Sequence, residues 1–264
     1  MMKKFLATLA ALCLMTGSAF AAKDNGTVYQ MAPMQSLALG GLEGFITVGE
    51  LKQFGDTGIG TFDGLNGEMI VLDGVVYQAI ADSSIVVVDD KVTVPFSNVA
   101  KFRADFKSKL TALSTKSSLE EQLNKLVDKH GRNSFYMIKL EGSFNRIDFR
   151  SEYAQQKPYP TLLKALEKSQ TEFTMNDVDG TIVGLYCPAY MGGLNAVGWH
   201  FHFITSDKTR GGHVMELDLK SGKVALDKLN RFEMLLPDLK TFQARDFTVD
   251  SKKDIVKAEH GNVH

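Results

Sequence analysis

The sequence predicts an α+β protein built mainly from antiparallel and mixed β-sheets, with two sub-domains and a few helices. Short apolar runs separated by glycine-containing turns dominate the chain, only two stretches show helical periodicity, and the second half consists mostly of strand patterns. The 264 residues are 44% hydrophobic and 23% charged, which is ordinary for a globular protein. This length allows one large domain or two small ones.

Residues 1–21 have the three parts of a secretory signal peptide. A start with two lysines is followed by an apolar run from Phe5 to Met15 and by an Ala-x-Ala cleavage pattern ending at Ala21. The alternative is a membrane anchor, but the run is too short for a hydrocarbon core of about 30 Å. We expect a periplasmic or secreted protein whose mature chain begins near Ala22 and has no membrane contact after cleavage.

Cleavage of the signal peptide would leave one cysteine in the mature chain. Cys13 leaves with the signal peptide, so Cys187 becomes the sole cysteine and has no internal disulfide partner. Cys187 lies in an apolar run, which favours a buried, inert side chain over a nucleophile.

An N-terminal α+β sub-domain is expected over residues 22–157. The stretches 68–72 and 75–78 are apolar and flank Asp73-Gly74, which predicts a β-hairpin. A second hairpin is predicted from the strand patterns 135–140 and 144–149 on either side of Glu141-Gly142-Ser143.

One amphipathic helix is predicted in the same sub-domain. Ser117-Ser118-Leu119-Glu120 resembles a capping box, and apolar residues then recur at helical spacing. Gly131 ends this helix directly after His130, whose cationic form would suit the helix C-terminus.

A C-terminal, β-rich metal-binding sub-domain is expected over residues 158–264, because Lys157-Pro158-Tyr159-Pro160 reads as a boundary. A weaker helix is predicted over 159–168. The predicted strands are 181–186, 198–204, 214–219, 223–226 and 232–236.

The formal net charge of −1 argues against a broad basic surface of the kind that binds nucleic acid. We therefore expect no nucleic-acid partner, while a local anion site remains open.

The strongest chemical signal is a group of three histidines. His200 and His202 alternate with large apolar residues in the predicted strand 198–204, so both point to one face while the apolar residues point to the other. A polar turn over 205–210 lets the chain fold back and bring His213 to the same face, and Gly211-Gly212 allow a tight backbone beside it.

Three imidazoles on one face suit Zn²⁺ or a similar divalent ion, with a coordination position left open for substrate. The alternative is that each histidine is only a polar residue on a half-wet strand, but this apolar-flanked arrangement of three is rarer. Spacing alone leaves the reaction open: such a site could be hydrolytic, oxygen-activating or structural.

The sequence resembles the α-acetolactate decarboxylase family over most of the mature chain. The motifs that carry the resemblance, in order and spacing, are Tyr29-Gln30 with Met34, Phe54 to Phe62, Leu65 to Met69, Arg132 to Tyr136, Gly180 to Gly184, Pro188-Ala189-Tyr190, Gly198 to Ile204 and Gly211-Gly212-His213. Together they are much more specific than His-x-His alone.

The resemblance implies a metal, usually Zn²⁺, bound by His200, His202 and His213. It also implies two functional carboxylates, Glu68 and Glu259, and a functional arginine. Arg150 matches the arginine, with Arg146 as the neighbouring alternative, and Thr61 is expected to line the same pocket. A homodimer is implied as well.

The implied reaction converts 2-acetolactate to acetoin and CO2. A metal that polarises the ketone would stabilise the enediolate left by decarboxylation, and Arg150 would orient the departing carboxylate. Either Glu68 or Glu259 would then deliver a proton to one face, which fixes the chirality of acetoin.

Two further functions remain open on the sequence. The first is an exported, non-catalytic protein that binds zinc or another ligand through the histidines. The second is a cupin-like metal oxygenase or isomerase, which glycine-bounded short strands do not exclude. The extent of the motif match favours the decarboxylase.

Overall fold

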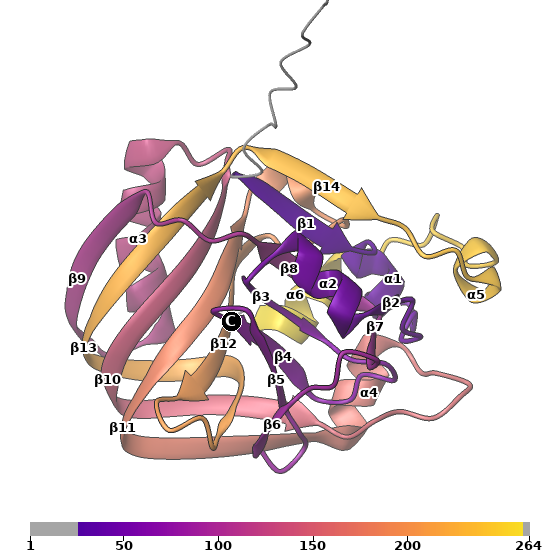
Figure 1. Cartoon of the computed structure of the whole chain (residues 1–264), viewed down its shortest axis with the longest axis horizontal. Coiled ribbons are helices and arrows are strands. Elements are labelled where there is room, and N and C mark those ends of the chain that lie inside the picture. The colour runs from indigo at the N-terminus through magenta and orange to yellow at the C-terminus, as the bar shows by residue number, and fades with distance from the viewer. Residues whose placement is uncertain (1–25, 261–264) are drawn as a thin grey trace, which may run out of the picture.

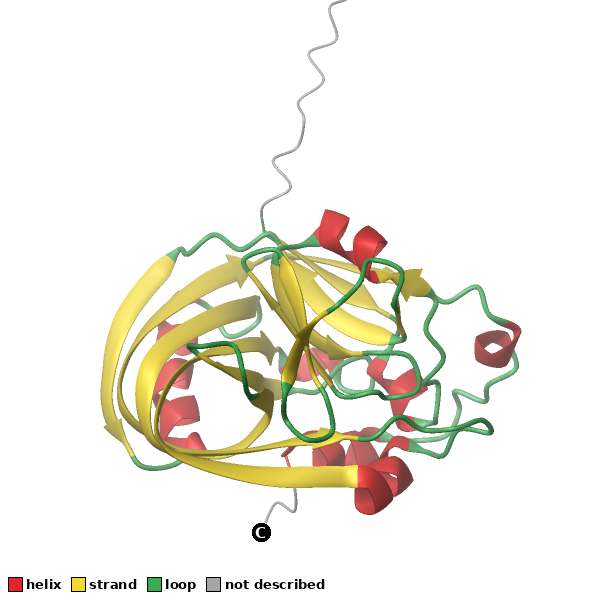
Figure 2. Ribbon diagram, turned by 60° about the horizontal axis from the view of Figure 1, so that its bottom comes forward, coloured by secondary structure: helices red, strands yellow, loops and turns green. Residues whose placement is uncertain are grey.

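The structure, a computed structural model, describes residues 26–260 (Figure 1). Two large sheets and several short helices make up this part of the chain, so the predicted strand-rich α+β class is confirmed (Figure 2). The predicted signal peptide, residues 1–21, lies outside the described range. Within that range, no helix combines the length and apolar character needed to cross a membrane.

The first sheet has seven strands and takes one of them from near the end of the chain. Its order is β14 (Arg231–Leu235), β1 (Thr27–Met31), β8 (Phe96–Ala100), β3 (Thr57–Thr61), β4 (Glu68–Leu72), β5 (Val75–Ala79) and β6 (Ile85–Val87). The pairing of β1 with β14 is parallel, and the other pairings are antiparallel.

The second sheet has five strands, all paired antiparallel. Its order is β10 (Phe135–Glu152), β11 (Gln170–Cys187), β12 (Gly198–Thr205), β13 (Gly211–Leu229) and β9 (Phe106–Leu113). Because β13 also pairs along β10, these long strands curl round on themselves (Figure 2). A separate two-stranded sheet joins β2 (Ile46–Thr47) to β7 (Thr93–Val94).

The helices are short apart from one. They are α1 (Met34–Ala38), α2 (Val48–Phe54), α3 (Lys116–His130), α4 (Leu162–Ser169), α5 (Lys240–Gln243) and α6 (Lys252–His260), with a 3₁₀ turn at Ala189–Met191. Helix α3 confirms the predicted amphipathic helix, although its N-cap is Thr115 and the capping box is completed by Ser118. It buries Leu119, Leu123 and Val127 in the core of the five-stranded sheet.

The first predicted hairpin is confirmed and the second is wrong. Strands β4 and β5 pair across Asp73-Gly74, and both turn residues have positive φ, as a tight two-residue hairpin requires. By contrast, residues 135–152 form one continuous strand.

Glycines explain why the chain does not turn there. Gly142 lies between Gly180 of β11 and Gly222 of β13, and a Cβ on Gly142 would lie 2.7 Å from the carbonyl oxygen of Ser221. The glycines thus let three long strands pass close together, instead of marking turns. For the same reason the predicted strands 214–219 and 223–226 are parts of the single strand β13.

Sheet pairing divides the chain differently from the boundary predicted after Lys157. Strand β10 precedes that position and β11 follows it, yet they pair from Tyr136 to Glu152. Strand β14 likewise joins the sheet formed by the N-terminal strands. The reason is that strand pairing depends on packing between residues far apart in the chain. Prolines indicate only where the local backbone does not readily continue a helix or strand.

The two sheets pack face to face, and this contact positions the site. Ile59 and Ile70 of the seven-stranded sheet share one core cluster with Val183 and Ile204 of the five-stranded sheet. Cys187 belongs to this cluster and is fully buried, and burial raises the pKa of its thiol, as expected for an inert cysteine. In Figure 1, α6 lies between the two sheets, near β3, β4 and β12.

Candidate metal centre and active site

The three predicted histidines come from one antiparallel pair of strands. His200 and His202 lie on β12, and His202 is the direct register partner of His213 on β13. Trp199, Phe201 and Phe203, which alternate with these histidines along β12, face the opposite side and pack in the core with α3, as the alternation predicts. A Cβ on Gly212 would lie 2.3 Å from the carbonyl oxygen of Arg150, so this glycine allows β13 to approach β10 beside the site.

The imidazole nitrogens converge on a single point. His200 Nε2 lies 3.1 Å from His202 Nε2 and 3.1 Å from His213 Nδ1, and one nitrogen from each ring lies within 4.8 Å of the others. Two nitrogens that bind one tetrahedral zinc ion at its usual bond length lie roughly 3.3 Å apart. The three rings therefore have the spacing of ligands to one divalent ion.

Backbone carbonyls fix two of the rings from outside. His202 Nδ1 donates to the carbonyl oxygen of Met69 at 2.8 Å, and His213 Nε2 donates to that of Glu259 at 3.1 Å. These bonds leave His202 Nε2 and His213 Nδ1 with lone pairs toward the centre. Burial, followed by the neighbouring positive charge of His200 or Arg150, lowers the pKa of both imidazoles well below the usual range. Both rings are therefore neutral, as metal ligation requires.

Two buried carboxylates border the histidines. Glu259 Oε2 lies 3.0 Å from His200 Nε2 and 3.9 Å from His213 Nδ1, while Glu68 Oε2 lies 3.3 Å from His202 Nε2. Both glutamates are only 7% exposed. Glu68 is the first residue of β4 and comes from the seven-stranded sheet, so the facing sheets each supply part of the site.

Helix α6 brings Glu259 into position. The sequence by itself shows a polar tail there, but Ile255 and Ala258 are buried against α1 and α4. Arg150 Nη2 donates to the carbonyl oxygen of Ala258 at 2.6 Å, one residue before Glu259. The end of α6 is thus tied to β10 next to the histidines.

The structure separates the two candidate arginines. Arg150 is 8% exposed, lines the pocket at the histidines and is the register partner of His213. Arg146 is exposed and pairs with Asp148. Among residues 26–260, only Arg150 of the two faces the site.

Thr61 is buried and lines the same pocket. Its hydroxyl donates to the carbonyl oxygen of Gly67 at 2.8 Å and so holds the turn that precedes Glu68. The pocket has a polar side that contains the predicted residues and an apolar side. The apolar side consists of Met34, Leu37, Leu65, Phe96, Leu162 and Leu166.

Sequence reasoning missed Glu152, which also lines this pocket and is 1% exposed. Its signal was present: Glu152 follows Arg150 by two residues on β10, so both side chains point to the same face. Burial is the main cause that raises the pKa of Glu68 and of Glu152, and the negative charge of neighbouring glutamates adds to it, while Arg150 opposes it. At least one carboxyl of the pair therefore keeps a proton near neutral pH.

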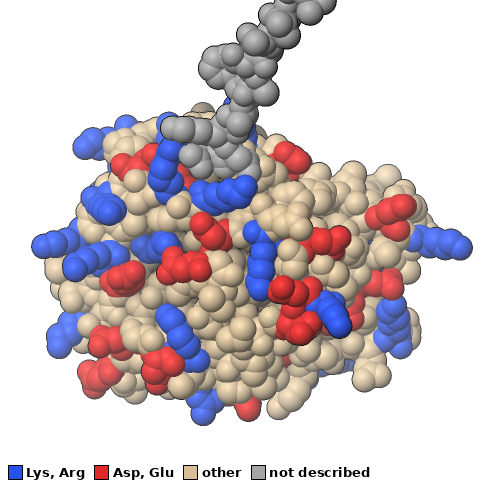
Figure 3. All heavy atoms as spheres, in the orientation of Figure 1, with Lys and Arg blue, Asp and Glu red and all other residues tan. Residues whose placement is uncertain are grey.

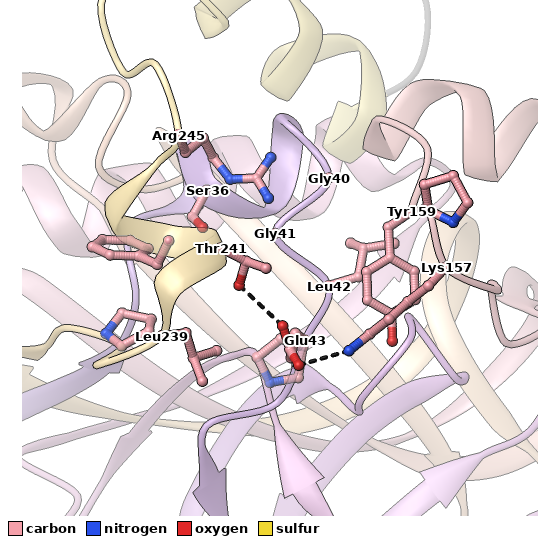
Figure 4. Close-up of a pocket in the computed structure, with 14 residues that line it drawn as sticks. Ser36, Gly40, Gly41, Leu42, Glu43, Lys157, Tyr159, Leu239, Thr241 and Arg245 are labelled. Atoms are coloured by element: carbon pink, nitrogen blue, oxygen red, sulfur yellow. Dashed lines mark hydrogen bonds and ion pairs between the residues drawn. The ribbon is translucent and has the colours of Figure 1, made fainter.

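A separate cavity of about 240 Å³ lies away from the histidines (Figure 4). Glu43 accepts hydrogen bonds from Lys157 and Thr241 there, so its carboxylate is already paired with a cation. None of the predicted site residues lines this cavity. On the face shown in Figure 3, acidic and basic side chains are interspersed rather than gathered by sign.

Comparison with known proteins now decides the family. The family model for α-acetolactate decarboxylase matches residues 28–249. The chain belongs to the α-acetolactate decarboxylase family. The matched range contains the three histidines, Glu68 and Arg150, and Glu259 follows it.

Individual members of the α-acetolactate decarboxylase family agree with this. The chain is 39% identical to the enzyme of Methanosarcina mazei, with 89% of this chain and 81% of the relative covered. It is 36% identical to that of Lactococcus lactis, with 88% and 98% covered. The crystal structure of the Bacillus subtilis enzyme superposes with a TM-score of 0.85 at 31% identity and covers 89% of this chain and all of that one. The comparisons give no support to a non-catalytic binding protein or a cupin-like oxygenase.

Proposed function

We propose that this chain decarboxylates 2-acetolactate to acetoin and CO2 with a divalent metal held by His200, His202 and His213. The observation that carries the proposal is the convergence of three buried imidazoles, three buried carboxyls and one buried arginine at a single pocket. Family membership supports the reaction class.

The donor set fits Zn²⁺, because three converging histidines, two of them oriented by backbone carbonyls, are typical of zinc centres with an open position. Bound there, the ion would polarise the ketone of the substrate and stabilise the negative charge that develops as CO2 leaves.

Arg150 is placed to hold the substrate carboxylate. Its two Nη groups donate to Ala258 and Gln170, whereas its buried Nε has no hydrogen-bond acceptor among residues 26–260. A carboxylate in the pocket would supply an acceptor for that donor. Since tight binding of the departing group also opposes its loss, the main contribution of Arg150 is to orient the C–C bond that breaks.

A glutamate completes the reaction. Cleavage sends the electron pair of the C–C bond into the neighbouring ketone, and the resulting enediolate must take a proton on carbon. Glu68 is the better donor, because burial raises its pKa and keeps it protonated. Glu259, which lies beside His200 and His213, is the alternative donor.

The apolar side of the pocket would contact the methyl groups of the substrate. Leu65, Phe96 and their neighbours can pack against the methyl groups of the substrate and exclude water from the reacting carbon. A fixed orientation between the apolar and polar sides would present one face of the enediolate to the proton donor.

The decisive experiment measures acetoin formation from racemic 2-acetolactate by the purified chain from Ala22 onward. We expect activity that stops on chelation and returns with Zn²⁺. One equivalent of bound metal, with acetoin formed no faster than in the protein-free control, would reject the proposal. If activity returns with another divalent ion but not with Zn²⁺, the choice of zinc is rejected and the decarboxylase proposal stands.

Export and assembly are further parts of the proposal. The signal-peptide pattern of residues 1–21 supports export, and N-terminal sequencing of the protein from a periplasmic or secreted fraction should begin near Ala22. The homodimer implied by the family resemblance is checked by sedimentation of the mature chain.

A further inference from the structure

We infer that the cavity shown in Figure 4 is a second small-molecule site, which takes a monocarboxylate with an apolar body and binds its carboxylate through Arg245. The cavity is distinct from the pocket at the histidines, because the two have no lining residue in common.

Three segments far apart in the chain enclose this cavity. They are residues 36–43 from α1 and the loop after it, residues 157–159 before α4, and residues 237–245 with α5, and Pro95 completes the lining. A Cβ on Gly40 would lie 2.6 Å from the carbonyl oxygen of Pro160. Glycine at position 40 therefore lets the first segment approach the second closely, so that both form walls of one cavity.

The charges in the cavity leave one cation without an anionic partner. Lys157 Nζ lies 2.6 Å from Glu43 Oε1, and the Thr241 hydroxyl donates to Glu43 Oε2 at 3.0 Å. No acidic side chain among residues 26–260 forms an ion pair with Arg245. Its guanidinium extends toward Gly40, apart from the Lys157–Glu43 pair (Figure 4). The lining thus carries one net positive charge, which favours a monoanion.

The guanidinium of Arg245 also has an unused donor. Its Nη1 donates to the carbonyl oxygen of Leu39, which connects the end of α5 to the end of α1. Its Nε is buried and has no hydrogen-bond acceptor within the described part of the chain. A buried donor without an acceptor costs free energy, and a carboxylate would supply the acceptor and the missing charge together. Burial lowers the pKa of Arg245, as expected for a cation that lacks this anion.

The remaining walls determine the rest of the ligand. They are mainly apolar and include Leu42, Pro95, Tyr159, Pro237, Leu239 and Phe242. The volume of about 240 Å³ is below the roughly 300–1,000 Å³ of sites for drug-sized ligands, so the occupant is smaller than those. A phosphate dianion fits less well, because it would place a second negative charge near Glu43 and leave the apolar walls uncovered.

Benzoate is the probe, because it joins one carboxylate to a compact apolar ring. Isothermal titration of the purified chain from Ala22 onward should show saturable binding of one equivalent. Arg245→Gln should weaken this binding about 10- to 100-fold, the usual effect of losing charge-assisted hydrogen bonds. Benzamide keeps the ring without the charge, and acetate keeps the charge without the ring, so each should bind at least about 10-fold more weakly.

A carboxylate would also fit at Arg150, so the location needs its own control. Arg150→Ala should bind benzoate as the wild type does. Arg245→Lys keeps the cation but loses the planar fork, and its affinity should lie between those of the wild type and Arg245→Gln. A Tm within about 2 °C of the wild type shows that a variant is folded, and Arg245→Lys carries the test if Arg245→Gln does not meet this criterion.

Three results would overturn the inference. They are the absence of saturable benzoate binding by about 10 mM, a loss of binding in Arg150→Ala but not in the Arg245 variants, and phosphate binding as tight as that of benzoate. The titration involves no turnover. A chain that binds benzoate through Arg245 but forms no acetoin therefore rejects the decarboxylase proposal and leaves this site standing.

Discussion

The proposed metal-binding half of the site and its proposed acid–base half are built in different ways. The three histidines lie within 14 residues of sequence, on two strands joined by a tight turn. Glu68 and Glu259 lie 191 residues apart, and the seven-stranded sheet and α6 bring them to the histidines from two directions. Local strand geometry thus brings the imidazole nitrogens together, while the packing of sheet on sheet and helix on sheet adds the buried carboxyls.

The largest expected effect comes from the local half. His202→Ala should abolish stoichiometric metal binding and lower activity about a thousandfold or more, because a fully buried ligand is lost. Metal analysis and acetoin assays on the same preparation check this. His130→Ala, on α3, is the control, and equal metal loss in both variants would show a general folding defect.

Removal of the distant half should separate metal binding from catalysis. Glu259→Gln should retain the metal and lower kcat about 100- to 1000-fold, because the group beside His200 Nε2 can no longer carry charge or a proton. Asp254→Asn on the same helix should have no such effect. Metal loss in Glu259→Gln equal to that in His202→Ala would break the proposed division into two halves.

The two arginines of β10 give a smaller, sharper contrast. Arg150→Ala should lower kcat/KM about 10- to 100-fold, the size of one or two charge-assisted hydrogen bonds. Arg146→Ala should change kcat/KM less than about twofold, because its surface ion pair with Asp148 contributes little. Steady-state kinetics with 2-acetolactate measure both values, and similar effects would contradict the assignment of Arg150.

The smallest effect concerns stability and pH. Burial raises the folded-state pKa of Glu152 to about 7, so the folded protein binds this proton more tightly than the unfolded chain does. The contribution of the protonated Glu152 carboxyl to the free energy of unfolding is complete below the unfolded carboxyl pKa of about 4.3. This contribution is lost as the pH rises through about 7. The Glu152→Gln variant should not show this decrease in the free energy of unfolding, because the glutamine side chain stays neutral at every pH.

Thermal unfolding of chelator-treated protein checks the sign. Glu152→Gln should exceed the Tm of the wild type by a small margin at pH 5 and by a larger one at pH 8, by about 2–4 °C for each kcal/mol recovered. A wild-type Tm that rises relative to the variant between pH 5 and pH 8 would show that Glu152 is stabilised in its charged form.

The sequence by itself determined the features that depend only on residues close together in the chain. Alternation along 198–204 set the shared face of His200 and His202, the apolar spacing after residue 118 set helix α3, and Asp73-Gly74 set the β4–β5 hairpin. The place of Glu68 and Arg150 in the site was expected through family resemblance, not through any local pattern.

Only the tertiary structure decided which segments became partners. It kept β10 continuous through Gly142, where a turn is locally plausible, because strands pair with it on both sides. It also converted a polar tail into α6 and placed Glu152 in the same pocket as Glu68. Such choices depend on burial and on hydrogen bonds between residues far apart in the chain, and these energies have no counterpart in local spacing.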